Sequence, residues 1–74
     1  MIEIMIEKIF KLTGEYIELI RLLKVMHIVE SGGQAKMIVE QKEVRVNGTT
    51  EIRKRAKLRS GDRVSVFDQE ILIQ

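Results

Sequence analysis

The chain divides into segments of different hydrophobic periodicity, separated by turn signals at 13–14, 31–33, 47–48 and 60–62. Before the first turn, Ile2, Ile4 and Ile6 alternate with polar residues as in a strand. The spacing of Ile2, Ile6 and Ile9 also fits one face of a helix, so both readings remain open. The β-branched content and the Thr13-Gly14 turn favour a strand over residues 5–12.

Two helices are expected next. Residues 15–26 carry apolar side chains at three- and four-residue steps, which predicts a helix with a broad apolar face: Tyr16, Ile17, Leu19, Ile20, Leu22, Leu23 and Met26. Acidic Glu15 and Glu18 then fall in its first turns, with Arg21 and Lys24 in its last, as the helix dipole favours. Ser31 and Gln34 have capping-box spacing and predict the start of a second helix that ends near Gln41. The short connection should pack the two helices together.

The remainder has β periodicity. Val44-Arg45-Val46, Asn47-Gly48 and residues 49–52 predict one hairpin. Residues 64–67 and 71–73 predict a second hairpin, turning through Asp68-Gln69-Glu70. The expected fold is therefore α+β, in the order β-α-α-β-β-β-β, with two short helices packed on a small, mostly antiparallel sheet.

Length and composition limit the chemistry. The chain has 74 residues, enough for one domain with one modest core. It has no cysteine, which excludes disulfides and thiolate metal sites, and its one histidine, His27, excludes a histidine-rich metal cluster. The charges that interrupt residues 1–12 do not fit a signal peptide or a membrane span. We expect a soluble cytoplasmic protein that needs no cofactor or metal.

Charge is distributed unevenly. The formal net charge is only +2. Residues 1–30 carry four Lys or Arg and five Glu, whereas residues 31–74 carry nine Lys or Arg and six acids. Residues 53–59, Arg-Lys-Arg-Ala-Lys-Leu-Arg, hold five cations and no acid. Such a run is often only a solvated surface, but it also suits binding to a polyanion.

Catalysis is not expected. A nucleophilic Ser or Thr needs a neighbouring base, and no spacing ties His27 to a serine. A single histidine at a helix end is most often a capping or surface residue. The Gly32-Gly33 pair is too short for a P-loop.

Anion binding has two candidate locations. At the start of the second helix, Gly32 and Gly33 would let a phosphate approach free backbone N–H groups, with Lys36 one turn further on. Equally, these glycines could serve only to turn the chain into the helix. The basic run should lie in a connecting loop, with Leu58 and Ala56 anchored in the core and the cations facing solvent. All three aromatic residues, Phe10, Tyr16 and Phe67, are expected to be buried, which argues against a stacking platform for single-stranded bases.

These residues resemble a known family. From Glu15 to Phe67 the chain is similar to the S-four-type RNA-binding domain, or alpha-L motif, of a small-subunit ribosomal protein, pseudouridine synthases and tyrosyl-tRNA synthetases. The resemblance lies in Leu22-Leu23-Lys24, in Ser31, Ala35 and Lys36, in Val44-Arg45-Val46-Asn47-Gly48, and in Leu58, Gly61-Asp62 and Val64. Small stand-alone bacterial members of the YbcJ and YaaA type share Glu-Ser-Gly-Gly-x-Ala-Lys, as at 30–36, and Arg-Lys-Arg-x-Lys-Leu, as at 53–58.

Two positions depart from the family pattern. Many members have an arginine after the capping serine, where Gly32 stands here. Members also tend to have glycine where the second helix closes, at Lys42 in this chain. A left-handed lysine there would cost on the order of 1 kcal/mol.

The resemblance implies a single RNA-binding domain over 1–74, with its motif core at 15–67. Its expected partner is structured ribosomal or transfer RNA, in ribosome assembly or RNA metabolism, with ribosomal or assembly-factor proteins nearby and no membrane. The RNA-contacting residues expected are Lys24, Ser31, Gly32, Gly33, Lys36, Arg45, Arg53, Lys54, Arg55, Lys57 and Arg59. Two alternatives remain: a module whose basic loop binds an acidic protein, and a minor enzyme subunit.

Overall fold

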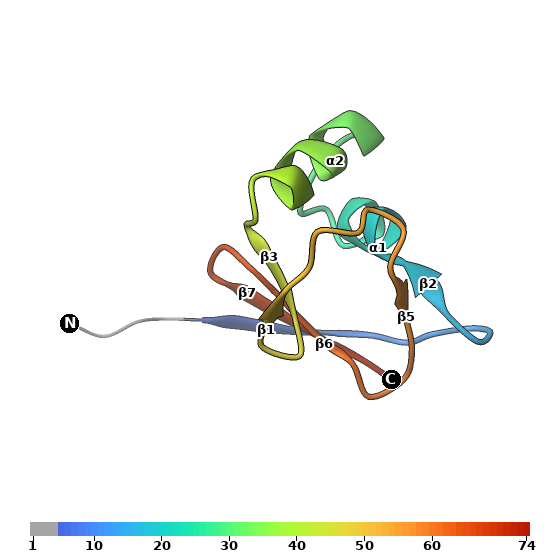
Figure 1. The fold of residues 1–74 in the computed structure, drawn as a ribbon. Coiled ribbons are helices and arrows are strands. Elements are labelled where there is room, and N and C mark those ends of the chain that lie inside the picture. Colours follow the sequence, from blue (N-terminus) through green and yellow to red (C-terminus); the bar gives the residue numbers. More distant parts are fainter. Residues whose placement is uncertain (1–4) are drawn as a thin grey trace.

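A computed structural model describes residues 5–74 and places both helices on one side of a small sheet (Figure 1). The elements, in chain order, are β1 (Ile6–Phe10), β2 (Ile17–Glu18), α1 (Leu19–Val25), α2 (Gly32–Glu40), β3 (Val44–Val46), β4 (Thr49–Thr50), β5 (Lys57–Leu58), β6 (Arg63–Val66) and β7 (Gln69–Ile73). The α+β class and the pair of short helices are therefore confirmed. Ile2 and Ile4, whose alternation with polar residues supported the first predicted strand, lie outside the described residues.

Five strands form the main sheet, in the order β1-β7-β6-β3-β4. Only β1 and β7 pair in parallel, so the sheet is mostly antiparallel, as predicted. Side chains alternate between its two faces. The face toward the helices carries the buried Val44, Val64, Val66, Ile71 and Ile73. On the other face, Arg45, Ser65 and Glu70 align across three strands. Ile9 and Leu72 are the apolar residues of β1 and β7 on this mostly polar and charged face.

The first helix begins later than the sequence pattern indicated. Ile17 and Glu18 are not helical but form β2, which pairs with β5. Glu15 and Glu18 therefore do not lie in the first turn of α1, although Glu18 is its N-cap residue. Of the two cations predicted in the last turn, Lys24 lies there and Arg21 does not. Ile17 fits the helical stripe, but it is buried opposite Leu58 as a strand residue. Tertiary pairing has overridden the local periodicity here.

Both helices end in the same backbone motif. After α1, the N–H of His27 donates to the Lys24 carbonyl and that of Ile28 donates to Leu23. After α2, Lys42 donates to Val39 and Glu43 to Ile38 in the same pattern, which is the Schellman motif. The residue after each helix cap has positive φ, 58° at His27 and 63° at Lys42. The histidine is thus an exposed helix-ending residue, and the left-handed lysine is confirmed.

The start of α2 agrees with the predicted cap. The Ser31 hydroxyl accepts from the Gln34 N–H at 3.2 Å. The Gln34 side chain reaches back to the Glu30 N–H at 2.7 Å, one residue earlier than in a standard capping box. Neither Gly32 nor Gly33 has positive φ, and a Cβ at Gly32 would meet nothing within 4 Å. The glycines are therefore not required for the chain to enter the helix.

Three details of the β region differ from the sequence prediction. The second strand of the first hairpin is only Thr49–Thr50, shorter than the predicted residues 49–52. The basic run, expected to lie in a loop, contains β5. The second hairpin turns at Phe67-Asp68, so Gln69 and Glu70 belong to β7 instead of the turn. Gln69 and Glu70 extend the pairing of β7 with β6 and with β1, which shortens the turn.

The aromatic side chains are more exposed than predicted. Phe67 is 57% exposed at the turn, and Tyr16 is 43% exposed just before β2; only Phe10 packs against the core. The core is instead aliphatic. Leu19, Leu22 and Leu23 of α1 and Ala35 and Val39 of α2 belong to the same buried cluster as the inward-facing residues of the sheet. Within residues 5–74, neither helix is long and apolar enough to cross a membrane.

Candidate nucleic-acid interface

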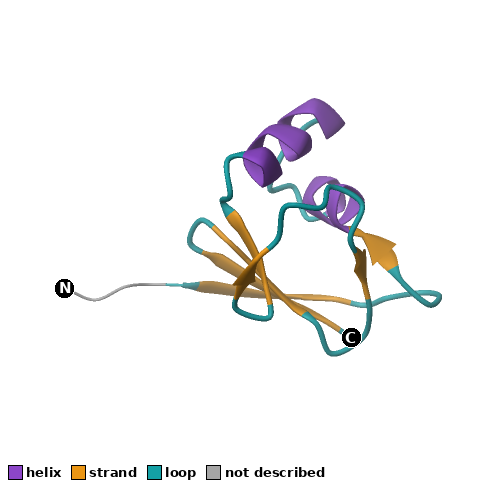
Figure 2. Ribbon diagram, viewed as in Figure 1, coloured by secondary structure: helices purple, strands orange, loops and turns teal. Residues whose placement is uncertain are grey.

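The basic run is attached to the N-terminal end of α1. The first N–H groups of a helix have no partner within it. In α1, the Leu19 N–H donates to the Ala56 carbonyl at 2.9 Å and the Ile20 N–H to the Lys54 carbonyl at 3.2 Å. Figure 2 shows this connection between β4 and β5 as a teal segment arching past α1. The side chains of Ala56 and Leu58 are buried, as predicted, and they anchor the segment from below.

The first three cations of the run contact carboxylates. Arg53 makes two side-chain bonds to Glu51, from Nη2 at 2.9 Å and from Nε at 3.1 Å. The Lys54 ammonium pairs with Glu40 on α2, and the Arg55 guanidinium lies 3.7 Å from Glu18. The positive charge of residues 53–55 is therefore partly compensated within the protein.

These pairs shift the titration of the acids. The hydrogen bond from the Arg53 side chain lowers the pKa of Glu51, and the same contact raises the pKa of Arg53. The hydrogen bond from Lys54 lowers the pKa of Glu40. Near neutral pH these carboxylates are therefore ionised, and the pairs with Arg53 and Lys54 are formed.

Lys57 and Arg59 are in a different environment. In the β2–β5 ribbon, Ile17 and Leu58 point inward, so the neighbouring residues of each strand point to solvent. Tyr16, one residue before β2, thereby meets both cations: the Lys57 ammonium is 4.8 Å and the Arg59 guanidinium 5.8 Å from its ring centroid. Among residues 5–74, no carboxylate lies within ion-pair distance of either cation. Their charges are available to an external anion.

The Asn-Gly and Gly-Asp motifs join two turns. The Asp62 carboxylate accepts from the Asn47 side-chain amide at 3.1 Å and from the backbone N–H of Arg59 at 2.8 Å. The Asn47 side-chain oxygen accepts from the Arg63 N–H at 2.9 Å. Gly61 supports this turn with a positive φ of 96°. The hairpin motif thus fixes the backbone that carries Arg59.

The α2 residues lie beside the same surface. Lys36 and Glu40 are four residues apart and so share a face of α2, and Glu40 contacts Lys54. Ser31, Gly32 and Gly33 are at the other end of this helix, where the N–H groups of the first turn point away from the helix body. Lys24 is exposed in the last turn of α1.

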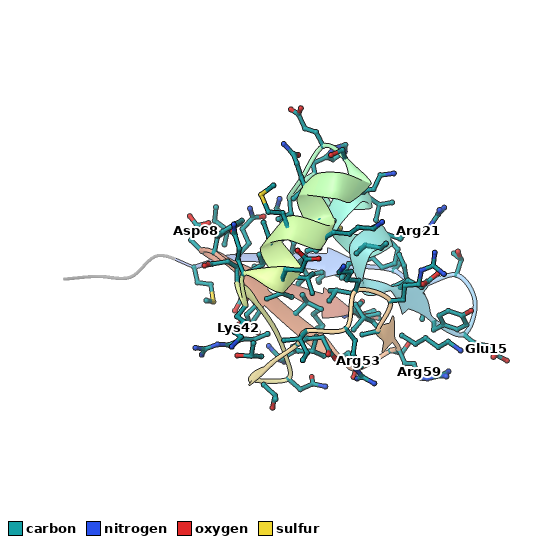
Figure 3. The ribbon with its side chains drawn as sticks, turned by 45° about the horizontal axis from the view of Figure 1, so that its top comes forward. Glu15, Arg21, Lys42, Arg53, Arg59 and Asp68 are labelled. Carbon is teal, nitrogen blue, oxygen red and sulfur yellow. The ribbon has the colours of Figure 1, made fainter. Side chains whose placement is uncertain are left out.

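Arg45 lies apart from the other predicted site residues. It is exposed on β3 and aligns with Ser65 of β6, on the sheet face that points away from the helices. It lines a shallow hollow with Lys42 and Phe67. In Figure 3, Arg53, Arg59 and Glu15 follow one edge of the molecule, with Lys42 toward the side away from Glu15.

Residues 10–74 match the family model of the S4 domain. The chain belongs to the S4 domain family. YbcJ of Escherichia coli strain K12, named as a candidate RNA-binding protein, is 44% identical over 58 residues, which are 78% of this chain and 83% of that protein. YbcJ of Shigella flexneri, which is named as uncharacterised, matches to the same extent.

The fold comparison agrees with the sequence comparison. The solution structure of E. coli YbcJ matches this S4 domain with a TM-score of 0.64 and 36% identity, covering 86% of this chain and 85% of that one. That structure is described as revealing an αL motif involved in RNA binding. The predicted family and alpha-L fold are therefore confirmed.

Sequence reasoning missed Tyr16 as a member of this surface. The residue fits the apolar stripe of a helix that in fact begins three residues later. The alternation of residues 16–18 and of residues 57–59 is compatible with two short strands, but nothing in the local sequence shows that they pair and place Tyr16 on the outer side.

Proposed function

We propose that this S4 domain is a non-catalytic RNA-binding protein that contacts the phosphate backbone of structured RNA. The observation that carries the proposal is the pair Lys57 and Arg59. Both are exposed on an anchored strand segment and are free of carboxylate partners among residues 5–74. The names of the YbcJ relative and its structure support RNA as the anion.

The remaining predicted contacts extend this surface, except Arg45, which lies on the sheet face that points away from the helices and is not part of the proposed interface. Lys24, Lys36 and the α2 start at Ser31, Gly32 and Gly33 would contact further phosphates, the last through backbone N–H groups. Lys54 and Arg55 would exchange the exposed carboxylates of Glu40 and Glu18 for phosphate, because such surface ion pairs contribute little stability. Arg53 would keep its less exposed partner Glu51 and contact phosphate through the exposed part of its guanidinium. Arginine suits this role, since its planar fork can donate two hydrogen bonds to one phosphate.

We further propose that the RNA is ribosomal or transfer RNA and that the protein acts in the cytoplasm of a bacterium, in ribosome assembly or RNA metabolism. Ribosomal or assembly-factor proteins would then be its neighbours. A surface built mainly from phosphate-binding cations reads the shape of a folded RNA more than its sequence.

Charge reversal tests this proposal. The double variant Lys57→Glu/Arg59→Glu should weaken binding to a transfer RNA transcript by at least about 10-fold, or about 1.4 kcal/mol. The plot of log affinity against log salt should become shallower by roughly two contacts, about 1.4 to 1.8 units. Fluorescence polarisation at several salt concentrations measures both.

The matched control is Lys42→Glu/Arg45→Glu, which makes the same charge change beside a hollow on the other face of the sheet. It should cost much less affinity. Equal loss in the two double variants would contradict the assigned surface. Binding to poly-glutamate in preference to RNA would favour an acidic protein as the partner instead.

A further inference from the structure

Tyr16 combines an exposed aromatic ring with two neighbouring cations. The Tyr16 side chain is 43% exposed, so its ring can be reached from solvent. Lys57 and Arg59 lie within cation–π distance of it. Proteins that hold unpaired nucleotides use this combination, an aromatic surface for the base and cations for the adjoining phosphate.

A hollow lies beside the ring. Its volume is about 390 Å³, and Tyr16 forms part of its wall. Apolar side chains of Phe10, Leu12, Ile17 and Val25 line it. Thr13, Glu18 and Arg21 add polar groups that could bond the edge of a planar ring. The accessible lining of the hollow is more polar than apolar, so it offers hydrogen-bonding groups beside the face of the Tyr16 ring.

Strand pairing and two hydrogen bonds that involve side chains position these parts relative to one another. The β2–β5 pairing sets Tyr16 next to Lys57 and Arg59, and the Arg59 guanidinium donates to the Glu15 carbonyl at 3.4 Å. Asp62 holds the backbone N–H of Arg59 at 2.8 Å. A base placed against Tyr16 would therefore meet a prearranged ring and prearranged cations.

We propose that Tyr16 stacks one unpaired nucleobase of the bound RNA, with the base entering the hollow and its adjoining phosphate contacting Lys57 and Arg59. This inference rests on the proposed RNA-binding function and makes it more specific. The preferred substrate is a folded RNA with an extruded or bulged nucleotide beside a helix, since a base that is already unpaired costs least to remove from the stack.

Two hairpins of identical stem test the proposal, one fully paired and one with a single bulged adenosine. The wild-type protein should bind the bulged hairpin more tightly, and Tyr16→Ala should lower affinity for that hairpin by roughly 5-fold to 100-fold. Tyr16→Ala should bind the paired hairpin nearly as wild type does. Tyr16→Phe keeps the ring and should retain the preference. Fluorescence polarisation gives the dissociation constants, and thermal unfolding checks that each variant is folded.

The outcomes separate the two proposals. If wild type binds both hairpins with equal affinity, or if folded Tyr16→Ala keeps the full preference, base stacking at Tyr16 is wrong and RNA binding stands. Equal weakening on both hairpins would also overturn stacking, because it would assign Tyr16 to positioning the cations. If neither hairpin is bound at low salt, both the stacking and the RNA-binding proposals fail.

Discussion

At the scale of single residues, the chain uses non-glycine residues where its backbone turns left-handed. His27 and Lys42 end the two helices with positive φ, and Asn47 and Phe67 occupy turns in the same region. Asparagine tolerates this conformation, whereas lysine and phenylalanine are strained in it. The strain at Lys42 is offset by the two backbone hydrogen bonds that close α2.

Lys42→Gly should therefore stabilise the protein by about 0.5 to 1 kcal/mol, because glycine adopts positive φ without the Cβ clash. The lysine side chain is exposed, so little packing is lost. Urea unfolding measures the change. Lys42→Ala keeps the clash and should show no such gain, while a Lys42→Gly protein less stable than wild type would refute the strain argument.

At the scale of elements, the Asn47-Gly48 and Gly61-Asp62 turns act together, since Asp62 links the β3–β4 turn to the backbone of Arg59. A carboxylate that accepts two hydrogen bonds is hard to replace, because its loss leaves a backbone donor and an amide without their partner.

Asp62→Ala should lower the free energy of unfolding by about 1 to 2 kcal/mol. Asp68→Ala, which removes an exposed aspartate from the other hairpin turn, should change it by less than about 0.5 kcal/mol. Chemical denaturation of both variants provides the comparison. Similar small effects in the two variants would show that the Asp62 contacts do not stabilise the fold.

The elements also show how far sequence reasoning reaches. Ser31, Gln34 and the Asn47-Gly48 hairpin were predictable because their signals are local backbone chemistry. The beginning of α1 was not, because Ile17 serves a strand whose partner lies 41 residues later, at Leu58. The same non-local pairing places Tyr16 on the exposed side of the β2–β5 ribbon. Arg45 points away from the helices because of how β3 pairs with β6, and that register is defined only in the assembled sheet.

At the scale of the whole molecule, the fold separates compensated from uncompensated cations. The carboxylates of Glu51, Glu40 and Glu18 contact residues 53–55, whereas Lys57 and Arg59 face solvent beside Tyr16. The net charge of +2 therefore understates the local positive potential at this edge. Binding should depend on that local surface more than on total charge.

The salt dependence of RNA binding tests this account most directly. With about five phosphate contacts, the log of the association constant of wild-type protein with a structured RNA should fall against log salt with a slope of roughly −3.5 to −4.5. Polarisation titrations of a transfer RNA transcript from low to physiological salt provide the slope. A slope near zero, or no binding at low salt, would contradict the claim that this domain holds RNA by its phosphates.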